Sequence, residues 1–281
     1  MNVLELLNQG SKHLKQKKIT SHRLDSEILL SKVLDKRRED VLINLDQKIY
    51  SNQIFRYNKL LNRRSQKEPV AYILQEKEFW SKSFFVNKNT LIPRPETELM
   101  VEKLVEIYKD KPLSILDIGT GSGCILISLV SELINSSGVG IDICKNAIQI
   151  AKKNLKKQKK TLNIKFLHKP LSGNFKQKFD LIVSNPPYIK SNDIKNLDDD
   201  IKKYEPRLAL DGGNDGLDVI KKVIYKTSNI LKQKGLLALE IGNKQSKKVS
   251  KILQKNNFKI EYTIKDYKNN VRCLISTYTD N

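Results

Sequence analysis

The segment LDIGTGSGC, residues 116–124, determines how the rest of the chain is interpreted. It starts as an apolar strand, passes through Gly119, Gly121 and Gly123, and leads into the helical pattern of CILISLVSEL. Glycines at such a junction allow a tight turn and let the backbone approach a ligand closely. A strand, a glycine-rich turn and a helix in this order predict the ligand-binding end of an α/β sheet.

An acidic residue lies at the end of the next strand, GVGIDI, where Asp142 stands nineteen residues after Gly123. A carboxylate at that position accepts hydrogen bonds from ribose hydroxyls. Asp117, beside the turn, would repel a pyrophosphate and suits a ligand with an ammonium group. S-adenosyl-L-methionine has an ammonium, a sulfonium and a ribose, so we expect it as the cofactor. The residues expected to contact it here are Asp117, Gly119, Thr120, Gly121, Ser122, Gly123 and Asp142.

Two alternatives remain for the glycine turn. A dinucleotide could bind there, although Cys124 stands at the last glycine position of the G-x-G-x-x-G pattern. A glycine-rich turn with only a structural role is the other alternative. The surrounding order of strand, turn, helix, strand and acid favours the ligand site over both.

Helices and strands alternate from Pro95 to the end of the chain. The predicted helices are 96–110, 124–133, 146–157, 217–233 and 244–256, and the predicted strands are 113–119, 138–143, 163–168, 179–185, 235–242, 258–267 and 271–278. This alternation predicts a doubly wound, mostly parallel, Rossmann-like α/β sheet covered on both faces. The short connection between the last two strands predicts an antiparallel C-terminal edge hairpin.

The first 75 residues read as helices only, with apolar stripes such as Leu24, Leu29 and Val33, and predict a small helical bundle. The aromatic, β-branched stretch that follows predicts a hairpin or extended linker. We therefore expect three parts: a helical substrate-docking domain at 1–75, a hairpin linker at 76–95 and a catalytic domain at 96–281.

The composition limits the classes of function. Uncharged apolar stretches in the 281 residues are strand-sized, so we expect no membrane association. The cysteines, Cys124, Cys144 and Cys273, lack paired spacing, which indicates neither disulfides nor a metal site and favours a reducing cytoplasm. The net charge of +21 comes from lysines scattered along the chain. It could mark an anionic partner such as nucleic acid or the ribosome, but compositional bias explains it better, so we expect that direct nucleic-acid binding is not required. We also expect a monomer.

A second segment, LIVSNPPYIK (181–190), ends a strand in a rigid corner. Proline fixes its own φ and restricts the residue before it, so Pro186 and Pro187 hold Asn185 and Tyr188 in place. The Asn185 side-chain oxygen and the Pro186 carbonyl can accept the two N–H groups of a planar nitrogen. Tyr188 offers a ring face to the same planar group. The corner predicts methylation of an amide or aromatic amine, with a proline-ended strand of purely structural role as the alternative.

Together, GTGSG, Asp142 and NPPY resemble the class I S-adenosylmethionine-dependent methyltransferases that act on planar nitrogens. Further stretches resemble the HemK/PrmC family, the glutamine methyltransferases of peptide chain release factors: EPVAYIL (68–74), IPRPETE (92–98), YEPRLALDGGNDGL (204–217) and LEIGNKQ (239–245). The resemblance covers essentially the whole chain. It implies that the partner and substrate is a class I release factor, methylated on the glutamine of its Gly-Gly-Gln motif.

The resemblance also implies roles for individual residues. Asn185, Pro186, Pro187 and Tyr188 correspond to the glutamine clamp, and Asn185 is expected to lie near both ligands. Three residues of IPRPETE, namely Arg94, Thr97 and Glu98, either contact the cofactor or cap the helix that starts near Glu96. Glu205 belongs to a loop that covers the substrate or forms a structural salt bridge.

The chain departs from the family pattern at several positions. Lys169 and Pro170 stand where many relatives have an acid and an aromatic residue beside the adenine, so Pro170 is expected to wall the adenine alone. Gln75, Ser81 and Asn269 stand where relatives usually have glycine. Two other substrates remain as alternatives: a glutamine of a ribosomal protein, and an exocyclic amine of DNA or RNA.

Overall fold

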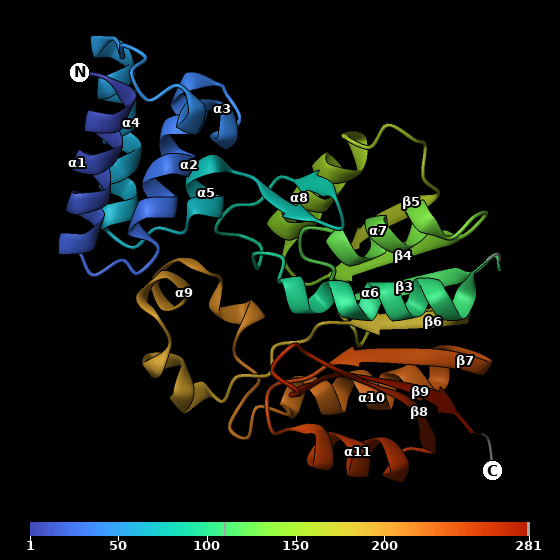
Figure 1. Ribbon diagram of the computed structural model, residues 1–281. Helices are drawn as coiled ribbons and strands as arrows, with labels where there is room; N and C mark the ends of the chain where they lie inside the picture. The colour runs from blue at the N-terminus through green and yellow to red at the C-terminus, as the bar shows by residue number, and fades with distance from the viewer. Residues whose placement is uncertain (110, 280–281) are drawn as a thin grey trace. The chain divides into compact units, whose positions relative to one another are not determined.

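The computed structural model describes residues 1–109 and 111–279. The last residue of the predicted helix 96–110 and the last two of the predicted domain 96–281 therefore lie outside the described residues. The chain forms two compact units (Figure 1). The helical unit contains residues 1–76 and 198–204, and the sheet unit contains residues 77–197 and those from 205 onward.

The helices of the helical unit are α1 (Val3–Gln16), α2 (His22–Leu34), α3 (Arg38–Ile43), α4 (Ser51–Ser65), α5 (Val70–Leu74) and α9 (Asp199–Tyr204). The unit packs α1 to α5 around one apolar core, to which α9 contributes no buried residue. The Asn2 side chain accepts from the Glu5 backbone N–H, and the Glu5 carboxylate accepts from that of Asn2, so a capping box starts α1. Leu6, Leu30 and Tyr57 are among the residues at the centre of this core.

The apolar stripe predicted for α2 is wrong at Leu24, which is 45% exposed. Two polar residues, Asp25 and Ser26, are buried instead. The Asp25 carboxylate accepts from the Arg64 guanidinium at 2.6 Å, and the Ser26 hydroxyl donates to the Leu7 carbonyl at 3.0 Å. Polar groups with satisfied hydrogen bonds can occupy a buried face, and hydrophobic periodicity alone does not reveal them.

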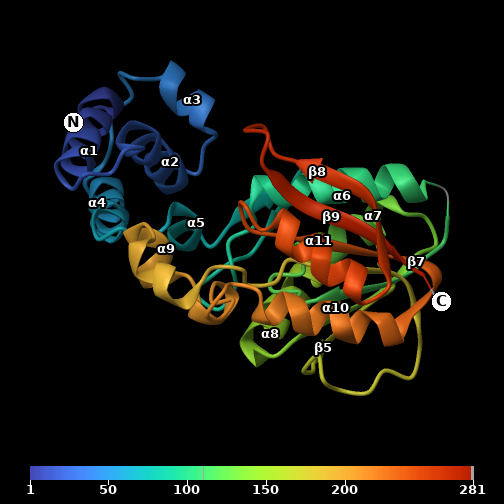
Figure 2. The same cartoon turned by 90° about the horizontal axis from the view of Figure 1, so that it is seen from below.

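The segment 198–204 joins the helical unit although it lies more than 120 residues along the chain from it. The Tyr204 hydroxyl donates to the Gln66 carbonyl at 3.0 Å, which ties α9 to the end of α4 (Figure 2). The predicted domain 1–75 did not include this segment. The docking role of the helical unit stays a prediction.

The sheet unit contains a seven-stranded mixed sheet within the described residues, in the order β5-β4-β3-β6-β7-β9-β8 (Figure 1). The strands are β3 (Ser114–Ile118), β4 (Ser137–Asp142), β5 (Ile164–His168), β6 (Phe179–Ser184), β7 (Leu231–Glu240), β8 (Phe258–Lys265) and β9 (Val271–Tyr278). Strands β3 to β7 pair in parallel, and β9 pairs antiparallel with both β7 and β8. The predicted α/β sheet with an antiparallel edge hairpin is confirmed.

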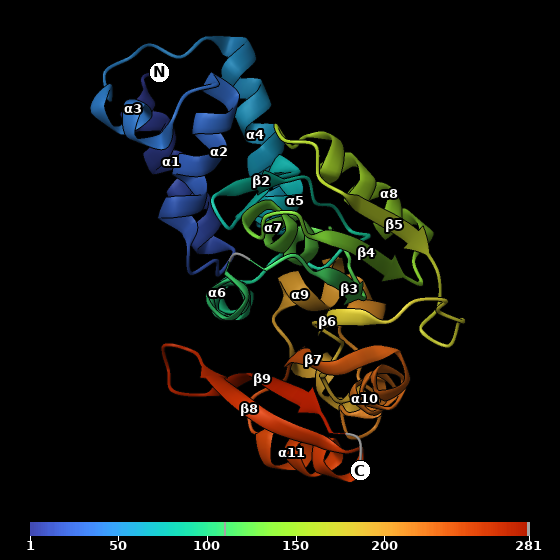
Figure 3. The ribbon, with the colours of Figure 1, turned by 90° about the vertical axis from the view of Figure 1, so that its right-hand side faces the viewer.

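Helices cover both faces of this sheet (Figure 3). The helices are α6 (Pro95–Tyr108), α7 (Cys124–Glu132), α8 (Lys145–Lys156), α10 (Asp218–Ile230) and α11 (Ser246–Lys255). Neighbouring strand residues alternate between two cores: Leu181 and Val183 pack under α6, α7 and α8, whereas Ile182 packs under α10 and α11. Strands buried on both faces explain why the sequence reads as continuous apolar runs. Because β3 to β7 pair in parallel, their carboxyl ends lie at the same edge of the sheet.

One predicted boundary is wrong in the sheet unit. The pattern of 217–233 predicts one helix, but α10 ends at Ile230 and β7 begins at Leu231. Leu231 is buried and pairs with Phe179 of β6, so pairing in the sheet overrides the helical pattern.

The linker forms a hairpin of β1 (Lys77–Phe79) and β2 (Lys82–Phe84), and the short helices η1 (Ser191–Asn196) and η2 (Arg207–Ala209) follow β6. Gln75, Ser81 and Asn269, which the resemblance predicts to stand in place of glycine, all have positive φ, at 57°, 52° and 64°. The backbone therefore keeps the conformation that glycine favours, with other side chains. No helix in residues 1–109 or 111–279 combines the length and apolarity needed to cross a bilayer.

Candidate active site

The glycine turn joins the end of β3 to α7, and two of its glycines serve different needs. Gly119 has φ 74°, its N–H donates to the Ile141 carbonyl at 2.9 Å, and a Cβ there would meet nothing within 4 Å. Gly123 has φ 80°, and a Cβ there would lie 2.8 Å from the Phe166 ring. The first glycine therefore leaves open space for a ligand at the turn, and the third allows α7 to pack closely on β5.

Asp142 lies at the end of β4, facing the same turn. Its Oδ2 accepts from the Gly121 N–H at 3.0 Å and its Oδ1 from the Cys144 N–H at 2.8 Å. Burial raises the pKa of the Asp142 carboxyl, and these backbone N–H groups oppose the rise. Each carboxylate oxygen keeps acceptor capacity, so the half-buried carboxylate suits two vicinal hydroxyls.

Asp117 lies beneath the turn and is completely buried. Its Oδ2 accepts from the Thr120 hydroxyl at 2.6 Å, while its Oδ1 is buried without a hydrogen-bond partner in the described part of the chain. Burial raises the pKa of Asp117 to about 7, and the charge of Asp142 adds to the rise. Because protein covers this carboxyl, the direct contact with the cofactor predicted for Asp117 stays a prediction, and only its electric field reaches the space at the turn.

The residues expected beside the adenine follow β5, and this region, unlike the glycine turn, includes exposed proline and apolar side chains. Pro170 is exposed, and the Lys169 ammonium donates to the Asn174 carbonyl and lies 4.2 Å from the centre of the Phe175 ring. Lys169 is thus tied to its own loop. Two large apolar side chains, Ile143 and Leu167, are 54% and 44% exposed at the ends of β4 and β5. The sequence alone does not single out these two residues, because apolar residues at strand ends attract attention only once their exposure to solvent is known.

The NPPY corner follows β6, the neighbour of β3 in the sheet. The Ser184 hydroxyl donates to the Ile118 carbonyl at 2.8 Å, which fixes the end of β6 beside the glycine turn. The Asn185 Nδ2 lies 3.4 Å from the Thr97 Oγ1. Neither the Asn185 Oδ1 nor the Pro186 carbonyl receives a hydrogen bond from the described residues. Two acceptors therefore remain available on one rigid corner.

Tyr188 is held at both its backbone and its hydroxyl. Its carbonyl accepts from the Gln245 Nε2 at 3.0 Å. Its hydroxyl accepts from the Arg272 Nη2 at 3.2 Å and lies 3.4 Å from the Glu240 Oε1. Burial raises the pKa of Tyr188 to about 12, so the phenol stays neutral near pH 7. A Cβ at Gly216 would lie 2.6 Å from the Tyr188 carbonyl, which explains a glycine in the loop 204–217.

None of the three IPRPETE side chains makes an N-terminal cap on α6, and their contact with the cofactor stays a prediction. Arg94 is the N-cap of α6 but makes no side-chain cap, and its guanidinium contacts the buried Glu205 carboxylate at 2.6 Å. Glu98 accepts from the Trp80 backbone N–H at 3.0 Å, so it supports the linker hairpin. Thr97 does not cap the helix either: its hydroxyl donates to the Glu240 Oε2 at 2.6 Å.

The sequence reading missed three residues around the clamp: Glu240, Gln245 and Arg272. Glu240 is 1% exposed and lies at the end of β7, the strand next to β6. An acid at the end of the apolar run GLLALEIG was the available signal, because a buried carboxylate is costly unless it has partners. Gln245 lies in LEIGNKQ, one of the stretches that resemble the family, but no role for it follows from that stretch alone, and Arg272 gives no signal in the sequence.

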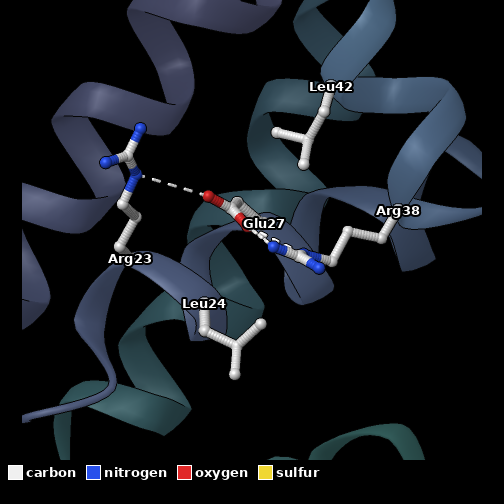
Figure 4. A pocket seen from close by; sticks show the side chains of 5 residues that line it. All are labelled: Arg23, Leu24, Glu27, Arg38 and Leu42. Atoms are coloured by element: carbon white, nitrogen blue, oxygen red, sulfur yellow. Dashed lines mark hydrogen bonds and ion pairs between the residues drawn. The ribbon is translucent and has the colours of Figure 1, made fainter.

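The helical unit has a surface pocket of about 440 Å³ between α2 and α3. In it, Glu27 contacts Arg38 at 2.7 Å and Arg23 at 3.5 Å, and Leu24 and Leu42 complete the lining (Figure 4). The residues predicted for the cofactor and the clamp all belong to the sheet unit. The predicted chemistry therefore falls in one unit, whereas this pocket is lined by residues of the other.

Comparisons with known proteins divide the chain at the same linker. The family described as PrmC N-terminal domain matches residues 5–74, and the Methyltransferase small domain matches residues 95–203. A solved structure, the ribosomal protein L11 methylase from Lactobacillus delbrueckii subsp. bulgaricus, superposes with a TM-score of 0.51 at 21% identity, over 67% of this chain and 81% of that one. This likeness supports the methyltransferase fold.

Curated relatives give the family. The bifunctional methyltransferase of Rickettsia felis is 36% identical over 98% of this chain, and the chain spans only 58% of that longer relative. The release factor glutamine methyltransferase of Buchnera aphidicola subsp. Baizongia pistaciae is 40% identical over 95% of this chain and 96% of its own. The resemblance drawn from the sequence motifs is thus confirmed, and the chain belongs to the HemK/PrmC family of release factor glutamine methyltransferases.

Proposed function

We propose that the chain transfers a methyl group from S-adenosyl-L-methionine to the side-chain amide nitrogen of the glutamine in the Gly-Gly-Gln motif of class I release factors. The observation that carries the proposal is the pair of open acceptors, Asn185 Oδ1 and the Pro186 carbonyl, at the end of the strand beside the glycine turn. Two neutral acceptors match the two N–H groups of a carboxamide and require no charge on it.

The amide nitrogen is a poor nucleophile, so positioning provides most of the catalysis. The cofactor supplies a methyl group made electrophilic by its sulfonium. Asn185 and Pro186 hold the amide N–H groups, and Tyr188 supports its planar face with a neutral ring. Methylation makes the nitrogen acidic, and its proton can then leave without a dedicated base.

The turn residues fit the cofactor. The open space beside Gly119 lets the ligand approach the backbone closely. The Asp142 carboxylate accepts hydrogen bonds from the ribose hydroxyls. Thr120, Gly121, Ser122 and Gly123 complete the turn, and the Asp117 charge favours the ammonium group. Pro170 is proposed to border the adenine together with the exposed Ile143 and Leu167.

Cofactor affinity should increase with pH between about 5.5 and 7.5. The pKa of Asp117 is raised to about 7, so a cation bound nearby favours the ionised form and binds less well when that form is depleted. At pH 6 roughly a tenth of Asp117 is ionised, which limits the loss of affinity to about ten-fold. Calorimetric titration across this range measures it.

The matched variant is Asp117→Asn, which should bind the cofactor more weakly and with a flatter pH dependence. Above about pH 7.5 the cofactor's own amino group begins to lose its proton, so the comparison stays below that value. Equal pH profiles for the two proteins would remove Asp117 from the cofactor site.

We also propose that the helical unit docks the release factor. A glutamine in an exposed loop offers few contacts, whereas the rest of a large substrate can contribute orientation through remote binding. The helical unit has its own core, and its pocket offers two arginines beside exposed apolar carbons.

Deletion of residues 1–76 should leave cofactor affinity within a few-fold, because the turn and Asp142 belong to the other unit. Activity on the whole factor should decrease far more than activity on a short Gly-Gly-Gln peptide. The deletion also removes the contacts of α9, such as that of Tyr204 with Gln66, and activity on the peptide shows whether this loss damages the catalytic unit. Equal activity of the shortened and full chains on the whole factor would contradict docking.

The substrate suggests where and how the protein acts. Release factors act on ribosomes, so we place the chain in the cytoplasm, and we propose a monomer because the turn and the clamp come from the same unit of one chain. The proposed function is tested by offering labelled S-adenosylmethionine with a class I release factor, ribosomal proteins and RNA side by side. We expect label in the release factor; label only in ribosomal protein or RNA would refute it.

A further inference from the structure

The carboxamide of Asn185 has two edges, and the clamp functions with only one of them. Its Oδ1 can accept from a substrate amide, whereas its Nδ2 would place a donor against a donor. We propose, on the basis of the methyl transfer proposed above, that Thr97 and Glu240 are positioning residues that fix the Asn185 carboxamide with Oδ1 toward the substrate glutamine.

The contacts form a chain through the protein interior. Thr97 lies in the first turn of α6 and is 2% exposed, and Glu240 ends β7 and is 1% exposed. The Thr97 hydroxyl donates to the Glu240 Oε2 at 2.6 Å, a short hydrogen bond. The Asn185 Nδ2 approaches the same hydroxyl oxygen at 3.4 Å. Catalytic contacts are often long in a ligand-free protein and shorten when the substrate binds.

The direction of these bonds sets the orientation of Asn185. A hydroxyl has one hydrogen, and Thr97 gives it to the Glu240 carboxylate, so only lone pairs of Thr97 face Asn185. The Nδ2 edge can meet those lone pairs with a donor, whereas the Oδ1 edge would bring two acceptors together. A flipped Asn185 therefore loses its bond to Thr97 and is disfavoured.

The same carboxylate supports the other half of the clamp. The Tyr188 hydroxyl lies 3.4 Å from the Glu240 Oε1 and accepts from Arg272 at 3.2 Å. Burial raises the pKa of Glu240, and the positive charge of Arg272 opposes that rise. Glu240 thus connects Asn185 to Tyr188, which no hydrogen bond among the described residues links directly.

A purely structural role for Thr97 and Glu240 would not require a hydroxyl and a carboxylate. Replacing buried polar partners by apolar groups of similar shape is often neutral for stability, so packing alone does not need a hydroxyl and a carboxylate here. Helix capping does not need Thr97 either, because Arg94 is the N-cap of α6. The pair is explained by what it does to Asn185.

Thr97→Val keeps the shape of the side chain and removes the hydroxyl. We expect kcat to fall by roughly a hundred-fold, with the cofactor Kd and the KM for the release factor changed little. Thr97→Ser should recover most of the activity. Glu240→Gln should also lower kcat, because its amide can donate to Thr97 and reverse the bond. Thr227→Val is the matched control, since that buried threonine donates only to the Val223 carbonyl within α10.

A double-mutant cycle separates positioning from structure. In the Asn185→Ala background, Thr97→Val should cause no further loss, because its effect acts through Asn185. A full additional loss in that background, or near-normal kcat in the Thr97→Val variant, would overturn the proposal while leaving the proposed function intact.

The orientation can also be measured without any activity. The side-chain amide signals of Asn185, assigned by their absence in Asn185→Ala, should shift in Thr97→Val and stay in place in Thr227→Val. Unmoved signals in Thr97→Val would overturn the proposal. This readout still tests the relay if the wild-type chain methylates no release factor, which would refute only the proposed function.

Discussion

Replacing Asn185 by alanine is expected to lower the rate of methyl transfer by about 10²–10³, by analogy with the loss of one hydrogen bond in an oxyanion hole. The Oδ1 of Asn185 is one of the two acceptors proposed to hold the substrate amide, and the remaining Pro186 carbonyl leaves that amide free to rotate. A planar nitrogen that rotates away from the methyl group loses the alignment on which its reactivity depends.

Single-turnover measurements with saturating cofactor give this rate directly. Cofactor affinity should stay within a few-fold, because Asp142 and the glycine turn are unchanged. Asn192→Ala makes the same chemical change at an exposed position in η1 and should leave the rate unaltered. A near-normal rate for Asn185→Ala would rule out the clamp.

The second large effect is expected for Asp142→Ala on cofactor binding. The carboxylate is proposed to accept from two ribose hydroxyls, and a hydrogen bond to a charged group contributes about 1.5–3 kcal/mol. Loss of even one such bond weakens binding roughly 10- to 150-fold. Isothermal calorimetry with S-adenosylmethionine measures the change.

Asp142 also accepts from the Gly121 and Cys144 N–H groups, so the turn itself could loosen in the alanine variant. Asp142→Asn retains one side-chain acceptor and should show an intermediate affinity. Asp180→Ala, which removes a carboxylate bonded to Ser114 and Lys232 at the other end of the sheet, should bind normally. Unchanged affinity in Asp142→Ala would remove Asp142 from the site.

The sequence predicted those parts of the fold whose pattern is local. Alternating helices and strands gave the parallel sheet, and the motifs GTGSG and NPPY marked the ends of β3 and β6. These two strands are neighbours, which puts Gly119 and Asn185 at the same edge, as the doubly wound topology requires. The backbone conformations that glycine and proline favour are local properties, so they can be predicted from the sequence without knowledge of tertiary contacts.

Features that depend on distant partners could not be read in the same way. Hydrophobic periodicity predicts Leu24 in a buried stripe, because the pattern carries no information on the hydrogen bonds that stabilise Asp25 and Ser26 in the interior. The partnership of Thr97 with Glu240 joins residues 143 positions apart, and its meaning appears only when β6 and β7 are side by side. The segment 198–204 likewise shows its place in the helical unit only through tertiary contacts such as that of Tyr204 with Gln66.

The central claim, methylation of a glutamine side-chain amide, is tested most directly by locating the transferred methyl group. The purified chain is incubated with S-adenosylmethionine and a class I release factor, and the digested factor is sequenced by mass spectrometry beside a factor whose motif glutamine is replaced by glutamate. We expect one added methyl group on the glutamine of the Gly-Gly-Gln peptide and none on the variant. A methyl group on another residue, or equal methylation of the glutamate variant, would contradict it.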